Sequence, residues 1–145
     1  MAIPALTPVP RVQRPRRATP ADAVRPTRAE VNLDHLRHNL RVLRRLSGGT
    51  RLWGVLKADG YGHGAPAVAR TLERSGIDGL CVALLAEAVE LRNAGIHAPV
   101  LVMGGHYGHG WGELLAHALT PVIYDREPLE ALAKEVHLYG LSLIH

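Results

Sequence analysis

The chain has little cysteine and no long apolar run, and both shortages limit what it can be. Its 145 residues contain one cysteine, Cys81. A single thiol cannot form an internal disulfide, which fits a reducing compartment. Cys81 stands in the apolar run 80–86, which predicts a buried thiol.

No apolar run approaches the ~20 residues that a membrane-spanning helix needs. The first ten residues lack a charged segment followed by an apolar one, so we expect no secretory signal.

Positive charge is concentrated at the N-terminus. The formal net charge is +4, but residues 1–28 hold six arginines and one acidic residue, Asp22, so the remaining chain is slightly acidic. Residues 1–26 also hold six of the ten prolines, and such a segment cannot bury enough apolar surface to offset the entropy of ordering it. We therefore predict a disordered leader whose removal leaves the melting temperature nearly unchanged. A nucleic-acid arm is disfavoured by the lack of aromatic residues, and a transit peptide by the prolines.

From residue 27 onward, strand-like and helix-like patterns alternate. Residues 27–33 alternate in polarity and predict one strand, and Asp34 is the expected N-cap of a helix that ends near 47–49. The arginines and histidines of this helix are expected to form a solvated surface. Four apolar strand patterns follow, each succeeded by a helical pattern. The expected strands are 52–56, 78–83, 99–103 and 121–124, and the expected helices are 66–75, 87–93 with Gly95 as C-cap, 111–119 and 127–136.

This rhythm predicts a parallel sheet covered by helices. Nearly continuous apolar strands that alternate with amphipathic helices are typical of βα units. Two architectures fit the pattern, a doubly wound sheet and a (β/α)₈ barrel. The pattern alone leaves both open.

Lysine is scarce, and one of the two lysines directly follows an apolar strand pattern. Lys57 comes after residues 52–56, and fifteen arginines make up the rest of the basic residues. A lone lysine at a strand end is most often a surface charge. An amine, unlike a guanidinium, can lose its proton and attack a carbonyl, and partial burial beside Val55 and Leu56 would favour the uncharged form. Tyr61 follows four residues later, so one helical turn would bring it to the same side.

The residues after this lysine carry a family resemblance. The stretch Lys-Ala-Asp-Gly-Tyr-Gly-His-Gly, residues 57–64, closely resembles the cofactor-lysine motif of alanine racemases, which usually has alanine where Gly60 stands. The resemblance extends from about Thr27 to about Val136. It implies an α/β fold that is the first part of a (β/α)₈ TIM-type barrel, about four βα units, preceded by one strand and a helix. A closed barrel needs eight strands over ~250 residues, so we expect a fragment.

The resemblance also implies a chemistry and a cellular role. Lys57 would be the catalytic lysine that bonds pyridoxal 5'-phosphate, and Tyr61 would lie near the cofactor phosphate. The substrate would be alanine, and the product D-alanine would supply peptidoglycan in the bacterial cytoplasm. The family acts as a homodimer, and its second acid–base group is a tyrosine of the partner subunit. No counterpart of that group is recognised in this sequence, so we expect the fragment alone to be inactive.

Two rival functions remain open at this level. One is a non-catalytic pyridoxal-phosphate-binding protein of the same barrel class, which the residues after Lys57 argue against. The other is a non-functional remnant that neither folds nor binds stably. Residues 137–145 do not resemble the family's continuation, which suggests a truncated or misjoined end, with a genuine short paralogue as the alternative. Related racemases for serine or a broader range of amino acids share the motif, so the substrate stays open.

The remaining polar residues point to no separate site. Asp59 and His63 are expected to stabilise the turn rather than to react. The glycine-rich segment 104–110 contains two histidines but too few ligands for a metal and no phosphate-loop pattern. We expect it to be a structural loop, and we expect no metal site, no nucleic-acid partner and no membrane contact.

Overall fold

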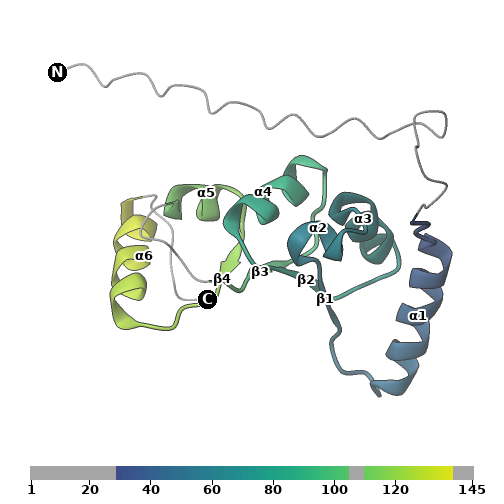
Figure 1. The fold of residues 1–145 in the computed structure, drawn as a ribbon. Helices are drawn as coiled ribbons and strands as arrows, with labels where there is room; N and C mark the ends of the chain where they lie inside the picture. Colours follow the sequence, from purple (N-terminus) through teal and green to yellow (C-terminus); the bar gives the residue numbers. More distant parts are fainter. Residues whose placement is uncertain (1–28, 105–109, 139–145) are drawn as a thin grey trace, which may run out of the picture. The chain divides into compact units, whose positions relative to one another are not determined.

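The computed structural model describes residues 29–104 and 110–138, in which four strands form one parallel sheet. The strand order is β1-β2-β3-β4, with helices α3, α4 and α5 on the same side of the sheet (Figure 1). The sheet and its helices belong to one compact unit that begins at Val31. The elements are α1 (Leu33–Leu46), β1 (Trp53–Val55), α2 (Lys57–Tyr61), α3 (Ala65–Arg74), β2 (Gly79–Val82), α4 (Leu85–Asn93), β3 (Val100–Val102), α5 (Trp111–Ala116), β4 (Thr120–Pro121) and α6 (Arg126–Leu138).

The strand order decides between the two architectures that the sequence pattern allowed. A doubly wound sheet reverses its strand order at a switch point and carries helices on both faces. Here each strand pairs with the next one in the chain, and the connecting helices α3, α4 and α5 share one side (Figure 1). This is the winding of a (β/α)₈ barrel, and the four βα units make about half of one. The predicted partial barrel is confirmed.

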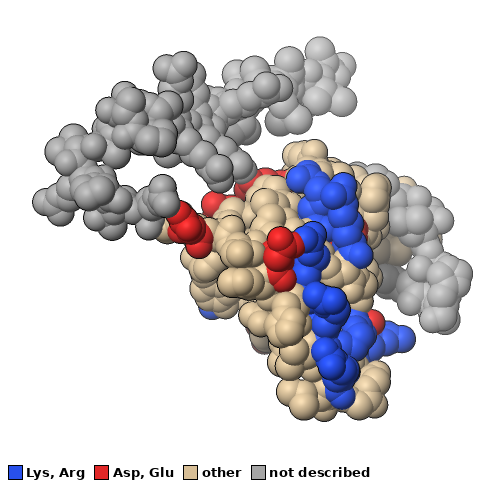
Figure 2. All heavy atoms as spheres, turned by 90° about the vertical axis from the view of Figure 1, so that its right-hand side faces the viewer, with Lys and Arg blue, Asp and Glu red and all other residues tan. Residues whose placement is uncertain are grey.

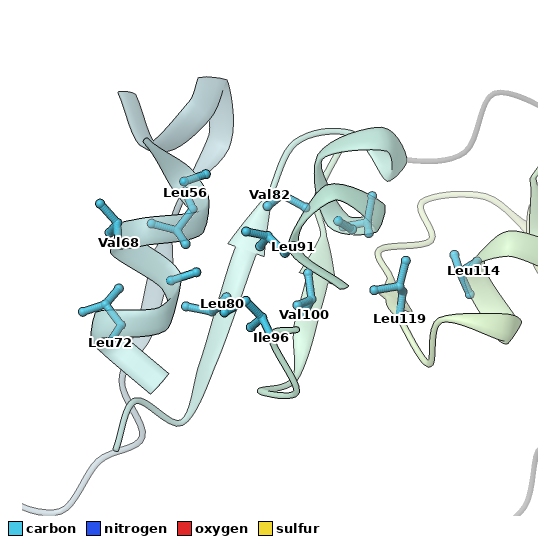
Figure 3. Close-up of a cluster of buried hydrophobic side chains, with 14 of the residues drawn as sticks. Leu56, Val68, Leu72, Leu80, Val82, Leu91, Ile96, Val100, Leu114 and Leu119 are labelled. Atoms are coloured by element: carbon cyan, nitrogen blue, oxygen red, sulfur yellow. The ribbon is translucent and has the colours of Figure 1, made fainter. Parts of the chain in front are cut away.

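The core lies between the sheet and its helices. Alternate strand residues point to opposite faces, and on β2 and β3 those that face the helices are almost fully buried. Figure 3 shows these side chains interleaved with those of α3 and α4. The largest fully buried side chains are Leu80, Val82, Leu91, Ile96 and Val100. Burying each one contributes roughly 1.5–3 kcal/mol relative to exposure.

The opposite face of the sheet is more open at its first strand. Trp53 and Val55 on β1 are 41% and 39% exposed. The strand register places Val55 beside Cys81, which is buried as predicted. The Trp53 indole lies across Gly79, where a Cβ atom would stand 2.5 Å from the ring. This is the face that points toward the interior in a barrel.

The prediction for residues 27–33 is wrong where the structure describes them. Residues 29–32 form no strand, and α1 already begins at Leu33. The N-cap is Asn32 rather than Asp34, because the Asn32 side chain accepts hydrogen bonds from the backbone N–H groups of Asp34 (2.9 Å) and His35 (3.2 Å). Asp34 instead pairs with Arg37 one turn later. A short alternating run without a neighbouring strand has no ladder to join, so the helix begins early.

Other boundaries shift by a few residues. The strand expected at 121–124 is only the two-residue β4, and α4 begins at Leu85 rather than at Glu87. The C-cap of α4 is Ala94, with Gly95 at positive φ as the residue after it. The last helix runs to Leu138, two residues beyond the predicted end. The ends of helices and strands differ from those predicted by the sequence pattern because fraying and capping depend on tertiary contacts.

Figure 2 shows a band of Lys and Arg side chains on the face of the molecule where α1 lies, and α1 carries four arginines, at 37, 41, 44 and 45. Most of them are exposed, as predicted for a solvated helix face. Arg44 is half-buried and binds Asp78, with 3.0 Å between the charged atoms. Since Asp78 directly precedes β2, this pair fastens α1 to the sheet. No helix in the described ranges is long and apolar enough to span a membrane.

Candidate functional site

The carboxyl ends of the first three strands meet at one edge of the sheet, because all pairs are parallel. Lys57 follows β1, Ala83 follows β2, and Gly104 follows β3. The backbone N–H of Gly104 donates to the carbonyl oxygen of Ala83 at 2.8 Å. A Cβ atom at position 104 would lie only 2.3 Å from that oxygen. Glycine is therefore the residue that lets these two loops touch at the edge where Lys57 lies.

Lys57 itself stands just outside the apolar strand. The buried Leu56 separates it from β1, and the Leu56 N–H continues the sheet by donating to the Cys81 carbonyl at 2.7 Å. Lys57 begins α2 and is exposed. The partial burial that its apolar neighbours predicted for Lys57 is not found. Leu56 points into the core, so the next residue, Lys57, points away from the core.

The turn after Lys57 has an unusual backbone. Residues 58 to 61 all have positive φ, with values of 53° at Ala58, 55° at Asp59, 64° at Gly60 and 55° at Tyr61. Together they form a left-handed helical turn rather than the flexible turn that the glycines suggested. Left-handed helix costs roughly 1–2 kcal/mol per non-glycine residue. Such a turn persists only where surrounding contacts hold it.

Several hydrogen bonds within the segment hold this turn. The N–H of Gly60 donates to the Leu56 carbonyl at 2.9 Å, and the N–H of Gly64 donates to the Asp59 carbonyl at 2.9 Å. The carboxylate of Asp59 accepts the Ala65 N–H at 2.6 Å. Nδ1 of His63 lies 3.0 Å from the Gly60 carbonyl oxygen. Asp59 and His63 thus make the turn contacts that the sequence predicted for them.

The left-handed turn brings Tyr61 back toward Lys57. The Nζ atom of Lys57 lies 5.9 Å from the centre of the Tyr61 ring, within cation–π range. The tyrosine is 59% exposed, so its hydroxyl remains available to a ligand. Both residues thus stand together at the carboxyl edge, as the spacing suggested, although through a turn of the opposite hand. Their roles in binding a cofactor remain predictions.

Glu87 also lies at this edge, and the sequence analysis did not predict a role for it beyond the start of a helix. Its Oε1 accepts the Ala58 N–H at 2.6 Å, and its Oε2 accepts the N–H groups of Ala83 at 2.9 Å and Leu84 at 3.0 Å. Glu87 occupies the third position of α4, where glutamate often reaches back to the N-cap N–H. The N-cap here is Leu84 rather than serine or threonine, so the usual sequence signature is incomplete. The contact to Ala58 spans 29 positions and leaves no local signal.

Neither a metal nor a reactive thiol is indicated in the described part of the chain. No three His, Cys, Asp or Glu side chains of residues 29–104 and 110–138 are placed to hold a metal ion. Burial raises the pKa of the Cys81 thiol, which favours its unreactive protonated form. His106 and His109, the histidines of the glycine-rich segment, lie outside the described residues.

Comparison with known proteins yields one family. Residues 31–140 match the family model for the N-terminal domain of alanine racemase. An alanine racemase of Sorangium cellulosum is 67% identical over 121 residues, which cover 79% of this chain and 32% of that protein. The chain thus spans about a third of the length of the curated relatives that it matches.

Solved structures agree with this assignment. An alanine racemase of Clostridium difficile superposes with a TM-score of 0.73 at 36% identity, covering 76% of this chain and 30% of that one. A histidine racemase of Leuconostoc mesenteroides superposes with a TM-score of 0.70 at 27% identity, covering 77% and 30%. The same half-barrel therefore occurs in racemases that are named for different amino acids, alanine and histidine.

Proposed function

The chain belongs to the alanine racemase family, and we propose that it is part of a pyridoxal-phosphate-dependent racemase that interconverts L-alanine and D-alanine. The observation that carries this proposal is the placement of Lys57 and Tyr61. An exposed amine stands 5.9 Å from the centre of an exposed tyrosine ring at the carboxyl edge of a parallel sheet, the edge where barrel enzymes bind substrate.

The described residues fit the cofactor. Lys57 provides an amine that solvent and ligand can reach, and Tyr61 provides a hydroxyl suited to a phosphate oxygen. The left-handed turn keeps the two on one short segment, so a single ligand could contact both. Pyridoxal phosphate, when bound, supplies a carbonyl carbon for the amine and a ring that takes up negative charge from the substrate α-carbon.

The proposed role of Lys57 has two parts. Its Nζ would hold the cofactor before substrate arrives. Once the amino group of the substrate has replaced it there, the freed amine would take a proton from the α-carbon, or return one, on a single face. Inversion requires a second acid–base group on the opposite face. By analogy with the family we propose that a partner subunit supplies it in a homodimer. A cytoplasmic location and a supply of D-alanine to peptidoglycan belong to the same proposal.

The first test identifies the lysine that bonds the cofactor. The chain is incubated with pyridoxal phosphate, reduced with borohydride, and digested for peptide mass mapping. We expect the pyridoxyl group on Lys57. Lys134 is the matched control, because it is the only other lysine and is also exposed, on α6. Equal labelling of the two lysines would contradict a dedicated site.

The second test concerns racemisation. Residues 31–138 replace the matching segment of the Sorangium cellulosum relative, which gives a protein of full family length. We expect this chimaera to racemise alanine, Lys57→Arg to abolish the activity, and Lys134→Arg to leave it nearly unchanged, because an arginine cannot form the bond to the cofactor. A chimaera that bonds the cofactor without racemising any amino acid would favour the non-catalytic binding protein.

A thermal melt of the unaltered 145-residue chain, followed by circular dichroism, tests the remnant hypothesis. The absence of a cooperative transition would favour the remnant.

A further inference from the structure

Glu87 connects two loops that the chain order keeps apart. One oxygen of its carboxylate binds the Ala58 N–H, next to Lys57, and the other binds the Ala83 and Leu84 N–H groups after β2. These three donors come from the carboxyl ends of neighbouring strands, whose register pairs Val55 with Cys81. The carboxylate therefore bridges the two strand ends at the proposed active-site edge.

We propose that Glu87 is a positioning residue, which fixes the left-handed turn that carries Lys57 and so sets where its amine stands. This inference rests on the proposed function of Lys57. Ala58 is the first residue of the turn with positive φ, and its N–H points at Glu87 over 2.6 Å. A strained backbone needs outside contacts to persist. Hydrogen bonds to a charged acceptor are stronger than bonds between neutral groups, so this contact can offset backbone strain at Ala58.

The chemistry of the contact requires a carboxylate rather than an amide. Both oxygens of Glu87 accept from backbone N–H groups, and a carboxylate is an acceptor on both sides. Glutamine has one oxygen and one NH₂ group, so one set of backbone donors would face another donor. The oxygen is expected to stay with Ala83 and Leu84 at the start of its own helix. The Ala58 N–H would then lose its partner.

Glu73 offers a matched control at the opposite edge of the sheet. Its Oε1 accepts the N–H groups of His97 (2.7 Å) and Ala98 (2.6 Å), just before β3 begins. It thus makes the same kind of carboxylate-to-backbone contact at the amino edge, away from Lys57. Glu73→Ala removes two such bonds and should destabilise the chain without reaching the turn.

The experiment compares the full chain with its Glu87→Gln and Glu73→Ala variants. Amide hydrogen exchange at Ala58 should become about tenfold faster in Glu87→Gln, the effect of one lost charge-assisted bond, and should stay within about twofold in Glu73→Ala. The ratio of borohydride-trapped pyridoxyl on Lys57 to that on Lys134 should fall by about tenfold in Glu87→Gln only, because displaced groups react more slowly. Equal losses in both variants would reduce Glu87 to general stability and overturn the proposal.

Failure of the proposed function has a different signature. If the unaltered chain shows no preference for Lys57 over Lys134, the function of Lys57 fails and the positioning role fails with it, whereas exchange at Ala58 still reports whether the turn is held. If Glu87→Gln does not fold, the unaltered chain decides by amide hydrogen exchange. The Ala58 and Leu84 amides should then both be protected, since a single carboxylate accepts from both. Exchange at Ala58 as fast as in an unstructured peptide would overturn the bridge.

Discussion

The carboxylate of Asp59 accepts a 2.6 Å hydrogen bond from the backbone N–H of Ala65, the first residue of α3. The N-cap of α3 is Gly64, which has no side chain to satisfy this donor. Asp59 therefore caps the helix from the preceding left-handed turn. Its negative charge also stands near the positive end of the helix dipole. One contact thus couples the turn that carries Lys57 to the helix that packs behind it.

Removal of this cap should destabilise the chain. Asp59→Ala is expected to lose about 1 kcal/mol of unfolding free energy, as for other N-caps, and Asp59→Asn much less because its amide oxygen can still accept. A thermal melt by circular dichroism measures the difference, which corresponds to several degrees in a domain of this size. Equal melting temperatures for Asp59→Ala and the unaltered chain would contradict the capping role.

Gly104 should tolerate no side chain. In Gly104→Ala the new methyl group would stand 2.3 Å from the backbone oxygen of Ala83, so a loop must move, at a cost of roughly 1–3 kcal/mol. Gly54→Ala is the control, because its methyl group would meet the end of the Leu72 side chain at 2.9 Å, and a side chain can shift more easily. Urea unfolding of both variants gives the comparison. The prediction fails if Gly54→Ala is the more damaging change.

Asp78 should make the stability depend on pH. The Leu52 N–H, 2.7 Å away, holds the pKa of the Asp78 carboxyl below its usual value, and Arg44 adds to this. A lowered folded-state pKa stabilises the fold above the unfolded value of ~3.9, and this stabilisation is lost as the pH falls through the folded value. Asp78→Asn should therefore melt lower than the unaltered chain at pH 7, and the gap should narrow toward pH 3. The exposed Asp125→Asn serves as control, and a gap that stays constant with pH would refute the linkage.

Replacement of Arg92 should lower the free energy of unfolding even when the new residue is lysine. Its guanidinium donates to the carbonyl oxygens of His117 (2.9 Å), Ile96 (2.8 Å) and Ala98 (2.9 Å) and so joins the segments before β3 and β4. Lysine has one nitrogen and cannot reach all three in a fixed fork. We expect Arg92→Lys to lose about 2 kcal/mol in urea unfolding. Arg70→Lys, where a single bond to Ala94 is affected, should lose much less.

Much of the fold could be predicted because its cause is local in sequence. The apolar strand patterns at 52–56, 78–83 and 99–103 placed β1, β2 and β3 within one or two residues, since burial against helices demands continuous apolar residues. The spacing of Lys57 and Tyr61 also indicated that they would share one side. The family resemblance, carried by residues 57–64, then selected the barrel that the periodicity alone had left open.

Tertiary structure decided the features that depend on distant partners. Residues 29–32 lack a strand because no strand of the described residues pairs with them. The exposure of Lys57 follows from the inward direction of Leu56. The left-handed turn could not be read from its glycines, since three of its four positive-φ residues carry side chains. It exists because Asp59 reaches Ala65 and Glu87 reaches Ala58 across 29 positions. Sequence periodicity records which residues are buried, but hydrogen bonds between strand ends form only after the strands have been brought side by side.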